Sequence, residues 1–579
     1  MKKKSILRQT ALFLATGLSL IASEVQADLY GLVVGIDEYT STKGLESLDG
    51  ATNDAKDINN ALKTAGAKDV KLLLDKEANR NNIMKSWDEL LTKSQAGDTI
   101  IFSYAGHGGR EEEHVKGSEP SGKDSVFLLG GFQWEGAGTF ERILDDEVSA
   151  MLKKALDKNR SVIMIADSCH SGTMTRGGKP MVKHKTRFAR YPEIKDDRLP
   201  PIDPKAHQYM LEEQPNLFYI GAVRDDEQAP EMEIDGQTRG ALSWAFAKAL
   251  RGAGDTDGDG QISAEELRHY LVETIRMQSE GMQHPSALGK SRSVSVPVGP
   301  GKKTEKTSPL EIAKSPPQLR FAIMNAQKAP PSLVEKLKGV TLVEPTAGTP
   351  APITRGRGRT EDAPTPSNSS DAQANLIWNV NERIIRTALG DEAAHIGPSS
   401  ILTRGRGRAE DPPANTDDET TQLPDVQKVI DKWRAVEAIK KISEGHSLSI
   451  SLKPHDGVHP LGSKMTYTIE GHDKTFFTLF NLASDGTVNF LYPLNDGKIK
   501  DPLEIPLGKP YTLNMKAEPP LGADHVVAIA SAAPLTGLHQ ALKQIDGKPE
   551  AEATLGLLYT HLSGQVYKMG IHGSYTGEK

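Results

Sequence analysis

Apolar runs of strand length alternate with amphipathic stretches over roughly the first half of the chain. This alternation predicts an α/β fold in which a mostly parallel sheet has helices on both faces. The expected strands are 29–36, 70–74, 99–104, 161–166 and 217–222, and the expected helices include 81–94 and 241–250. We assign residues 28–296 to this first domain.

The pattern changes after residue 296. Residues 297–423 are rich in Pro, Ser, Thr and charge, with two short apolar islands, which predicts a long disordered linker. An amphipathic helix is expected at 425–442, followed by short strands separated by Asp-Gly and Pro turns. Residues 424–579 are therefore predicted to form a helix plus a β-sandwich-like domain, whose partner is unknown.

The amino terminus has the composition of a secretory signal. A basic start is followed by the apolar run 11–22, which is too short to span a bilayer, and by small residues ending at Ala27. We expect residues 1–27 to be removed, leaving a periplasmic or secreted chain without a transmembrane span. The formal net charge of −7 argues against nucleic acid as a general partner.

Candidate chemistry stands at the ends of two expected strands, where open α/β sheets keep their sites. Cys169 is the only cysteine and lies in the turn 167–172, so it is either a nucleophile or a buried core thiol. His107 lies between glycines in the turn 104–108, which leaves the imidazole accessible. An imidazole beside a thiol can favour the thiolate and protonate a leaving amine, so the two residues suit nucleophilic catalysis.

The motifs Tyr-Ala-Gly-His-Gly (104–108) and Asp-Ser-Cys-His-Ser-Gly (167–172) resemble the catalytic signatures of caspase-like cysteine peptidases of the metacaspase type. The resemblance covers roughly residues 28–290 and implies a caspase-like fold. It implies an endopeptidase that cuts protein or peptide substrates after Arg or Lys, with Cys169 as nucleophile and His107 as acid and base. The backbone N–H groups of Gly108 and Cys169 would stabilise the oxyanion.

The same resemblance implies an acidic substrate pocket. Asp54 and Asp167 occupy positions that line a pocket for a basic side chain in metacaspases, and Asp226 or Asp225 would join them. Asp54 could instead cap the helix that it begins, and the two later residues could form a solvated turn. Ala105 stands where the family often has Ser.

Residues 174–216 are basic and contain prolines, which predicts an exposed loop beside Cys169. The resemblance implies that this region carries the processing site. The candidate bonds follow Arg176, Lys183, Lys185, Arg187 and Arg190.

The predicted linker contains an Arg-Gly repeat. Each copy is followed by acidic residues, so the repeat is only a weak indication of RNA binding. Its arginines are better explained as self-cleavage sites, and cutting there would separate the two domains. The arginines are Arg355, Arg357, Arg359, Arg404, Arg406 and Arg408.

Residues 255–266 match the twelve-residue calcium loop of the EF-hand type. The expected Ca²⁺ ligands are the carboxylates of Asp255, Asp257, Asp259 and Glu266 and the backbone carbonyl of Gln261. Asp145 and Asp146 suit the start of a helix. Some metacaspases bind an activating calcium with a paired Asp at that point, but Arg176 stands about where another acidic ligand would be expected.

Two functions of different classes remain open. The first is an exported, self-processing, calcium-binding cysteine endopeptidase. The second is a catalytically idle, calcium-stabilised surface scaffold or adhesion protein that retains the fold. Residues 484–493 resemble an uncharacterised domain that often follows bacterial caspase-like domains, and this resemblance does not separate the two.

Overall fold

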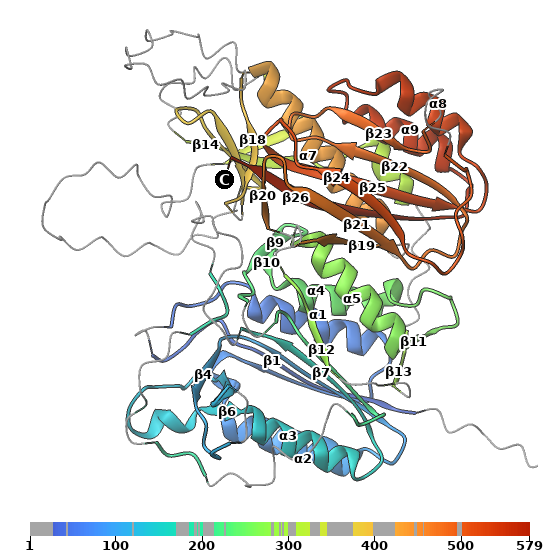
Figure 1. Cartoon of the computed structure of the whole chain (residues 1–579). Coiled ribbons are helices and arrows are strands. Elements are labelled where there is room, and N and C mark those ends of the chain that lie inside the picture. Colours follow the sequence, from blue (N-terminus) through green and yellow to red (C-terminus); the bar gives the residue numbers. More distant parts are fainter. Residues whose placement is uncertain are drawn as a thin grey trace, which may run out of the picture.

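The structure is a computed structural model, and it shows two domains stacked end to end (Figure 1). We call residues 27–298 the amino-terminal domain and residues 309–578 the carboxy-terminal domain. Among the described residues, no helix is both long and apolar enough to cross a membrane. The described residues are 27–41, 45–117, 121–169, 185–189, 194, 197–200, 213–224, 227–279, 283–288, 291, 294–298, 309–324, 336–343, 374–388, 390–397, 423–444, 448–454, 457–494 and 501–578.

A six-stranded sheet with the order β12-β8-β7-β3-β1-β2 forms the centre of the amino-terminal domain. Five strands run parallel, and only the edge strand β12 pairs antiparallel. This confirms the predicted mostly parallel sheet. The strands are β1 (Leu29–Gly35), β2 (Asp69–Leu74), β3 (Thr99–Ala105), β7 (Ser161–Asp167), β8 (Leu217–Gly221) and β12 (Ser286–Leu288).

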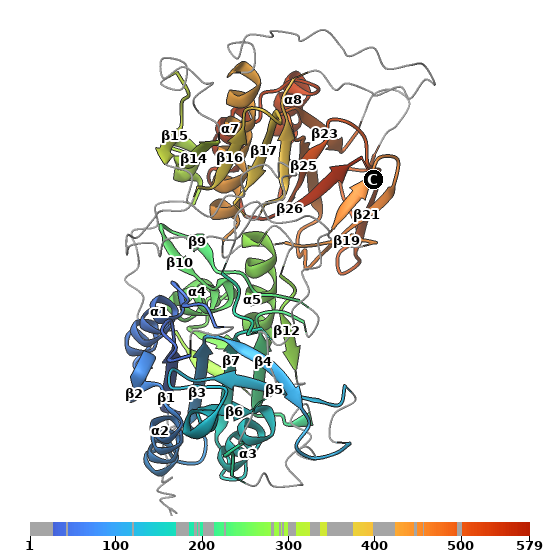
Figure 2. The ribbon, with the colours of Figure 1, turned by 90° about the vertical axis from the view of Figure 1, so that its left-hand side faces the viewer.

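Helices cover both faces of this sheet (Figures 1 and 2). One face packs against α1 (Ala51–Thr64), α4 (Ala241–Lys248) and α5 (Ala264–Gln278), and the other against α2 (Arg80–Lys93) and α3 (Asp145–Leu156). Because β1 and β3 are buried on both faces, they read as continuous apolar runs in the sequence.

Short elements surround the sheet. The strands β4 (Gly108–Glu112), β5 (Lys123–Leu128) and β6 (Arg142–Leu144) form a small sheet after β3. Two further pairs are β9 (Met232–Ile234) with β10 (Gln237–Arg239), and β11 (Gln261–Ser263) with β13 (Ser295–Pro297). Among the described residues, the short helices of this domain are Asp75–Glu77, Gly136–Phe140 and Ala249–Ala253, and a further one, Pro309–Lys314, packs in the core of the carboxy-terminal domain.

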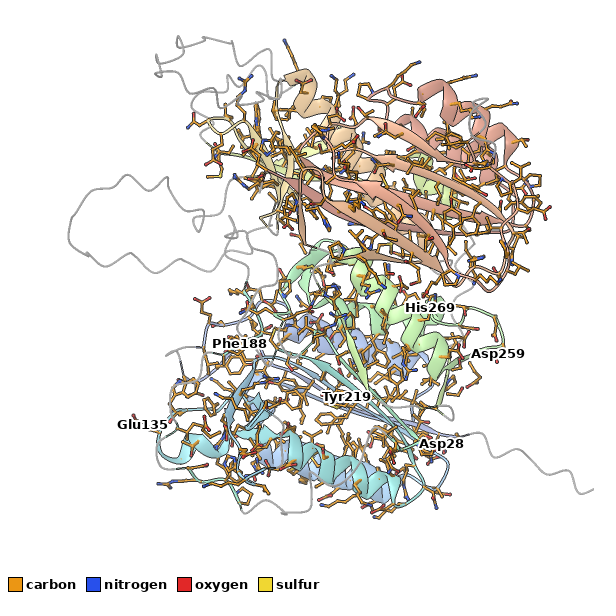
Figure 3. All side chains as sticks on the ribbon, in the orientation of Figure 1. Asp28, Glu135, Phe188, Tyr219, Asp259 and His269 are labelled. Carbon is orange, nitrogen blue, oxygen red and sulfur yellow. The ribbon has the colours of Figure 1, made fainter. Side chains whose placement is uncertain are left out.

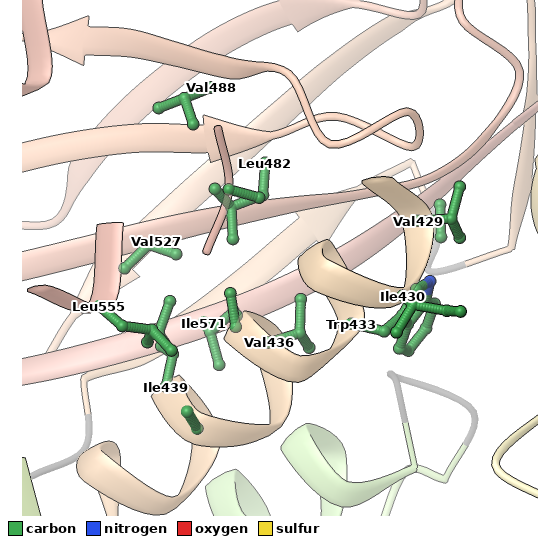
Figure 4. Packing of buried hydrophobic residues seen from close by; sticks show 14 of the residues in the cluster. Val429, Ile430, Trp433, Val436, Ile439, Leu482, Val488, Val527, Leu555 and Ile571 are labelled. Carbon is green, nitrogen blue, oxygen red and sulfur yellow. The ribbon is translucent and has the colours of Figure 1, made fainter. Parts of the chain in front are cut away.

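The carboxy-terminal domain has three layers. A ten-stranded sheet lies between a helical layer and a three-stranded sheet, with one apolar core on each of its faces. Figure 4 shows the first core, in which α7 side chains pack against strands and α9. The large sheet contains β14 (Leu319–Met324), β15 (Val340–Val343), β16 (Leu376–Asn379), β17 (Ile384–Thr387), β18 (Glu392–His395), β20 (Val458–Pro460), β22 (Phe476–Leu482), β23 (Val488–Tyr492), β25 (Gly522–Ser531) and β26 (Tyr567–Gly577). The small sheet contains β19 (Ser449–Lys453), β21 (Lys464–Glu470) and β24 (Tyr511–Lys516), and the helices are α7 (Leu423–Ser443), α8 (Thr536–Ile545) and α9 (Ala553–Leu562).

The structure differs from the sequence prediction in two parts of this domain. The apolar islands within the expected linker form β14 to β18 and belong to the large sheet. Their buried residues, such as Phe321 and Trp378, join the same core as α7. The expected β-sandwich-like domain also gains the helices α8 and α9, because one apolar face of each packs on the sheet.

Polar contacts join the two domains beside the β9–β10 hairpin. Lys248 of α4 lies 2.7 Å from the Glu444 carboxylate at the end of α7, and Lys441 lies 3.6 Å from Asp235. Glu233 in β9 forms an ion pair with Arg320 in β14. The β9–β10 hairpin of the amino-terminal domain therefore contacts the carboxy-terminal domain.

Candidate active site

The parallel register of β3 and β7 brings the two candidate catalytic residues to one edge of the sheet. Ala105 and Asp167 are register partners at the carboxyl ends of these strands. His107 and Cys169 each follow two residues later, and both are buried, with 2% and 0% exposure. Strand pairing therefore places the imidazole and the thiol in neighbouring turns.

The His107 ring is oriented by its backbone and by Glu46. Its Nε2 atom lies 2.7 Å from the Glu46 carbonyl, while its backbone N–H donates to the Tyr39 hydroxyl at 2.7 Å. Because a carbonyl can only accept, Nε2 carries the hydrogen of the neutral ring, and Nδ1 presents a lone pair. Nδ1 has no hydrogen-bond partner among the described residues, so it is available as a base.

The Cys169 sulfur contacts the backbone of Ala229. It accepts a hydrogen bond from the Ala229 N–H at 2.7 Å, and its own hydrogen points to the Ala229 carbonyl at 3.5 Å. Burial raises the pKa of Cys169 to about 12 and lowers the pKa of His107 to about 4. Both groups are therefore uncharged at neutral pH in this state, which is a resting dyad.

Residues 185–189, here called the covering segment, lie across this dyad. Its central residue, Arg187, directs its carbonyl oxygen to the backbone N–H groups of Gly108 and Cys169, at 2.9 and 3.2 Å. The Arg187 N–H donates to the Ala229 carbonyl at 3.2 Å. Figure 3 shows Phe188 at the carboxyl end of the sheet, far from Asp28 at the start of β1. The covering segment thus runs as an extended chain along the backbone of Gly108 and Ala229, in the manner of a peptide added to a strand edge.

The Arg187 side chain occupies an acidic pocket below this edge. Its guanidinium lies 2.5 Å from Asp54, 2.9 Å from Asp167 and 3.2 Å from Glu231. All four side chains are buried, with at most 2% exposure. The pocket therefore holds a cation that is completely removed from water.

The charges in the pocket depend on one another. Burial raises the pKa of Asp54 well above its usual range, and Arg187 acts in the opposite direction. Burial opposes the charge of Arg187, but Asp167, Asp54 and Glu231 outweigh it and raise the pKa of Arg187 further. Several buried carboxylates without a cation would be strongly destabilised, so the positive charge of Arg187 stabilises this pocket.

The structure brings together five of the residues proposed from the sequence. The dyad, the two backbone donors and the carboxylates of Asp54 and Asp167 converge on Arg187. Asp225 and Asp226 lie outside the described residues. So do the cleavage candidates Arg176, Arg355, Arg359, Arg404 and Arg408.

Sequence reasoning missed two contributors to the pocket. Glu231 follows the same turn after β8 as the proposed Asp pair, and its carboxylate reaches the pocket from there. Gly240, which directly follows β10, has no side chain and so leaves room for the Arg187 guanidinium beside Asp167. A Cβ atom on Gly240 would lie 2.3 Å from the Asp167 carboxylate and 2.4 Å from the Arg187 guanidinium. Only Gly fits a pocket of this depth.

The predicted calcium loop has a donor set that fits the ion. Ligand atoms of Asp255, Asp257 and Asp259 lie within 4.8 Å of one another, and Gly260 adopts a φ of 85° that permits the turn. The Glu266 carboxylate accepts hydrogen bonds from the start of the loop and from Ser263. It would exchange these bonds for the metal.

This loop is remote from the dyad. Gln261 lines one cavity with Asp28, Thr99 and Ser161, at the amino ends of β1, β3 and β7. Figure 3 shows Asp259 and Phe188 at opposite ends of the domain. A calcium ion in the loop would therefore not contact the reacting groups.

A second acidic cluster already contains a cation from the protein. Glu111, His114 and Asp197 have ligand atoms close together, and the Arg142 guanidinium binds both carboxylates at 2.9 Å. The Asp124 carboxylate raises the pKa of His114 to about 9. This cluster is therefore an ion-pair network among protein groups. The paired Asp145 and Asp146 begin α3.

Residues 30–176 match the family model of the metacaspase, peptidase C14 domain. Metacaspase-1 of Meyerozyma guilliermondii is 25% identical over 260 residues, which is 38% of this chain and 61% of the relative. Metacaspase-1 of Emericella nidulans is 26% identical over 271 residues, which is 38% of this chain and 62% of the relative. The chain thus spans about three-fifths of the length of these curated relatives.

Two solved structures are similar over 45% of this chain. Caspase-1 from Spodoptera frugiperda has a TM-score of 0.29 and 12% identity, covering 45% of this chain and 86% of that chain. A protein from Geobacter sulfurreducens has a TM-score of 0.31 and 19% identity, covering 45% and 92%. Because these TM-scores are low, the assignment rests on the sequence match and on the two motifs. The similarity of this chain to the metacaspase, peptidase C14 domain extends over residues 30–176.

Proposed function

We propose that this protein is a cysteine endopeptidase that cuts polypeptides after Arg or Lys. The observation that carries the proposal is Arg187, whose carbonyl and guanidinium occupy the positions that a cleaved residue requires. The carbonyl oxygen accepts from two backbone N–H groups beside the thiol, and the side chain contacts three carboxylates. An Asp side chain in the same pocket would meet only repulsion.

The proposed reaction begins when Nδ1 of His107 takes the proton of the Cys169 thiol. The thiolate then attacks the carbonyl carbon of the substrate Arg, and the electron pair of the C=O bond moves to oxygen. The N–H groups of Gly108 and Cys169 stabilise this oxyanion. The tetrahedral intermediate collapses as the C–N bond breaks, and the imidazolium gives its proton to the leaving amine.

Hydrolysis of the thioester completes the cycle. His107 takes a proton from water, and the resulting hydroxide attacks the acyl carbon. The C–S bond then breaks, the thiolate takes back the proton held by His107, and the acid product loses its own proton to water to leave as a carboxylate.

The first bond cut would be Arg187–Phe188 of the chain itself. The covering segment lies across the dyad while it is intact, and the buried Cys169 thiol has a raised pKa in this state. After cleavage, the new carboxylate at Arg187 and the new ammonium at Phe188 would be placed beside buried groups. Release of these ends would admit water and other substrates.

We further propose that the protein binds calcium and is exported. The 255–266 loop would bind one Ca²⁺ ion through its three Asp side chains, and its distance from the dyad favours a stabilising role over direct activation. Such loops suit a compartment where calcium is abundant, which fits the signal-like residues 1–27 and a periplasmic or secreted location.

The test uses the full chain and a Cys169→Ala variant, with peptide reporters that end in Arg, Lys or Asp before the reporter group. We expect the wild type to hydrolyse the Arg and Lys reporters, to spare Asp, and to lose all turnover in the variant. Parallel reactions with calcium and with chelator separate activation from stabilisation. Equal turnover by Cys169→Ala, or none by either protein in any condition, would favour the idle scaffold instead.

A further inference from the structure

We propose that Asp49 is a specificity-determining residue that selects a basic side chain two positions before the Arg after which the chain is cut. This inference rests on the proposed function and defines the substrate class of the same site. The substrates would read basic, any residue, Arg, apolar, small, with cleavage after the Arg. The covering segment, Lys-Thr-Arg-Phe-Ala, is one such sequence.

The covering segment is held as an extended strand on both sides of Arg187. Before the bond, the Lys185 carbonyl accepts from the Glu231 N–H at 2.9 Å, and Thr186 forms an antiparallel bridge with Pro230. After the bond, the Ala189 N–H donates to the Gly108 carbonyl at 2.8 Å. These are backbone contacts, so any substrate sequence can make them, and the side chains must supply the selectivity.

In an extended strand, alternate side chains point to the same face. Lys185 therefore lies on the same face as Arg187, and its ammonium is 2.7 Å from the Asp49 carboxylate. The backbone of Asp49 is held in place by Glu231. The Glu231 carboxylate accepts from the backbone N–H groups of Asp49 and Gly50, at 2.8 and 3.0 Å. The same carboxylate contacts Arg187, so one side chain fixes both subsites.

The position two residues after Arg187 is enclosed by apolar residues. Ala189 is completely buried and packs in one cluster with Leu45, Val126 and Trp134. A bulky side chain there would have to displace this cluster. Phe188, in contrast, is only partly buried, against the core on the α1 face. The first position after the bond should therefore accept apolar residues of several sizes.

The expected selectivity at Asp49 is modest because the pair is partly exposed. Lys185 is 32% and Asp49 53% exposed, and ion pairs of this kind change an equilibrium by about two- to fivefold. Salt should reduce the effect by screening. The Arg pocket is fully buried, so its preference should stay large at high salt.

The experiment compares quenched peptides Lys-Thr-Arg-Phe-Ala, Glu-Thr-Arg-Phe-Ala and Lys-Thr-Arg-Phe-Trp, with the self-processed full chain as enzyme. We expect kcat/KM for the Lys peptide to exceed that for the Glu peptide by at least about twofold, mainly through KM. Asp49→Asn should remove this difference, and Asp49→Lys should reverse it. The Trp peptide should be cut about tenfold more slowly by every variant.

A matched control is Glu112→Gln, which removes an exposed carboxylate from the same domain, 88% exposed, and should keep the wild-type preference. Equal rates on the Lys and Glu peptides by wild type, unchanged in Asp49→Asn, would overturn the role of Asp49 while leaving the peptidase intact. If wild type and Cys169→Ala cleaved the Arg peptides equally, or if neither cleaved them, the proposed function itself would be wrong. This inference would then be wrong with it.

Discussion

Replacing Arg187 by Ala is expected to release the covering segment and to open the active site. The guanidinium compensates three buried carboxylates, and removing one partner of a buried ion pair typically costs about 3–5 kcal/mol. The backbone hydrogen bonds that also hold the segment contribute only about 1 kcal/mol each. Occupancy of the site by the segment should therefore fall by roughly 10²- to 5 × 10³-fold.

The assay follows self-cleavage and reporter hydrolysis together. In the wild type, turnover of an Arg reporter should begin after a lag, as a fragment ending at Arg187 accumulates in mass spectra. In Arg187→Ala that fragment should be absent, and hydrolysis should begin without a lag. Arg187→Lys keeps the cation but loses the planar fork, so cleavage should persist at a lower rate. Lys185→Ala is the matched control in the same segment, with a two- to fivefold effect at most.

Two results would refute this reasoning. Cleavage of Arg187→Ala at the same bond and at the wild-type rate would show that the acidic pocket does not select the residue. A variant with a lower melting temperature and no reporter activity would show that Arg187 is a permanent structural ion pair. In that case the covering segment would be part of the fold rather than a bound substrate.

Three further outcomes are expected. Removing two carboxylate ligands with Asp257→Ala and Glu266→Ala should lower the melting temperature in calcium but not in chelator, as differential scanning calorimetry can check. Folding lowers the pKa of His107 from 6.5 to about 4. The contribution of the neutral imidazole to the free energy of unfolding is therefore complete above pH 6.5 and is lost as the pH falls towards 4. Denaturant titrations of His107→Gln should show up to about 3 kcal/mol less of this pH dependence. Gly240→Ala should abolish cleavage of Arg reporters, because the added methyl group would overlap the Asp167 carboxylate, and a folded variant with wild-type kcat/KM would contradict this.

The sequence predicted the sheet and the dyad because both depend on local patterns. Continuous apolar runs identify β3 and β7 as buried strands, and parallel pairing then requires their carboxyl ends to meet. The two catalytic turns follow at equal distances from one register pair, so their proximity needs no knowledge of side-chain packing. The two motifs indicated the resemblance to metacaspases, and the acidic pocket was predicted from that resemblance.

What the sequence did not predict depends on contacts between distant segments. Glu231 contributes to the pocket only because its turn passes beside the covering segment, 44 positions from Arg187. Arg187 was one of several basic residues in a loop without periodicity, and only the structure distinguishes it from its neighbours. The strands β14 to β18 are four to six residues long and stand in polar surroundings, so their pattern alone could not outweigh a linker composition.

The strands within the expected linker change what cleavage at the Arg-Gly repeats should do. One repeat stands between β15 and β16 in the sequence and the other between β18 and α7, both outside the described residues. The strands on either side stay paired, since β14 pairs with β16 and β18 with β25, and they share one apolar core with α7. A chain cut at both repeats should therefore run as separate fragments on a denaturing gel and elute as one species from a native sizing column. Separate elution of the fragments would show that the pairing is too weak to hold them. Co-elution would mean that self-cleavage in this region nicks the protein without releasing the peptidase domain, because β14, which precedes both repeats, still pairs with β16 and shares one apolar core with α7.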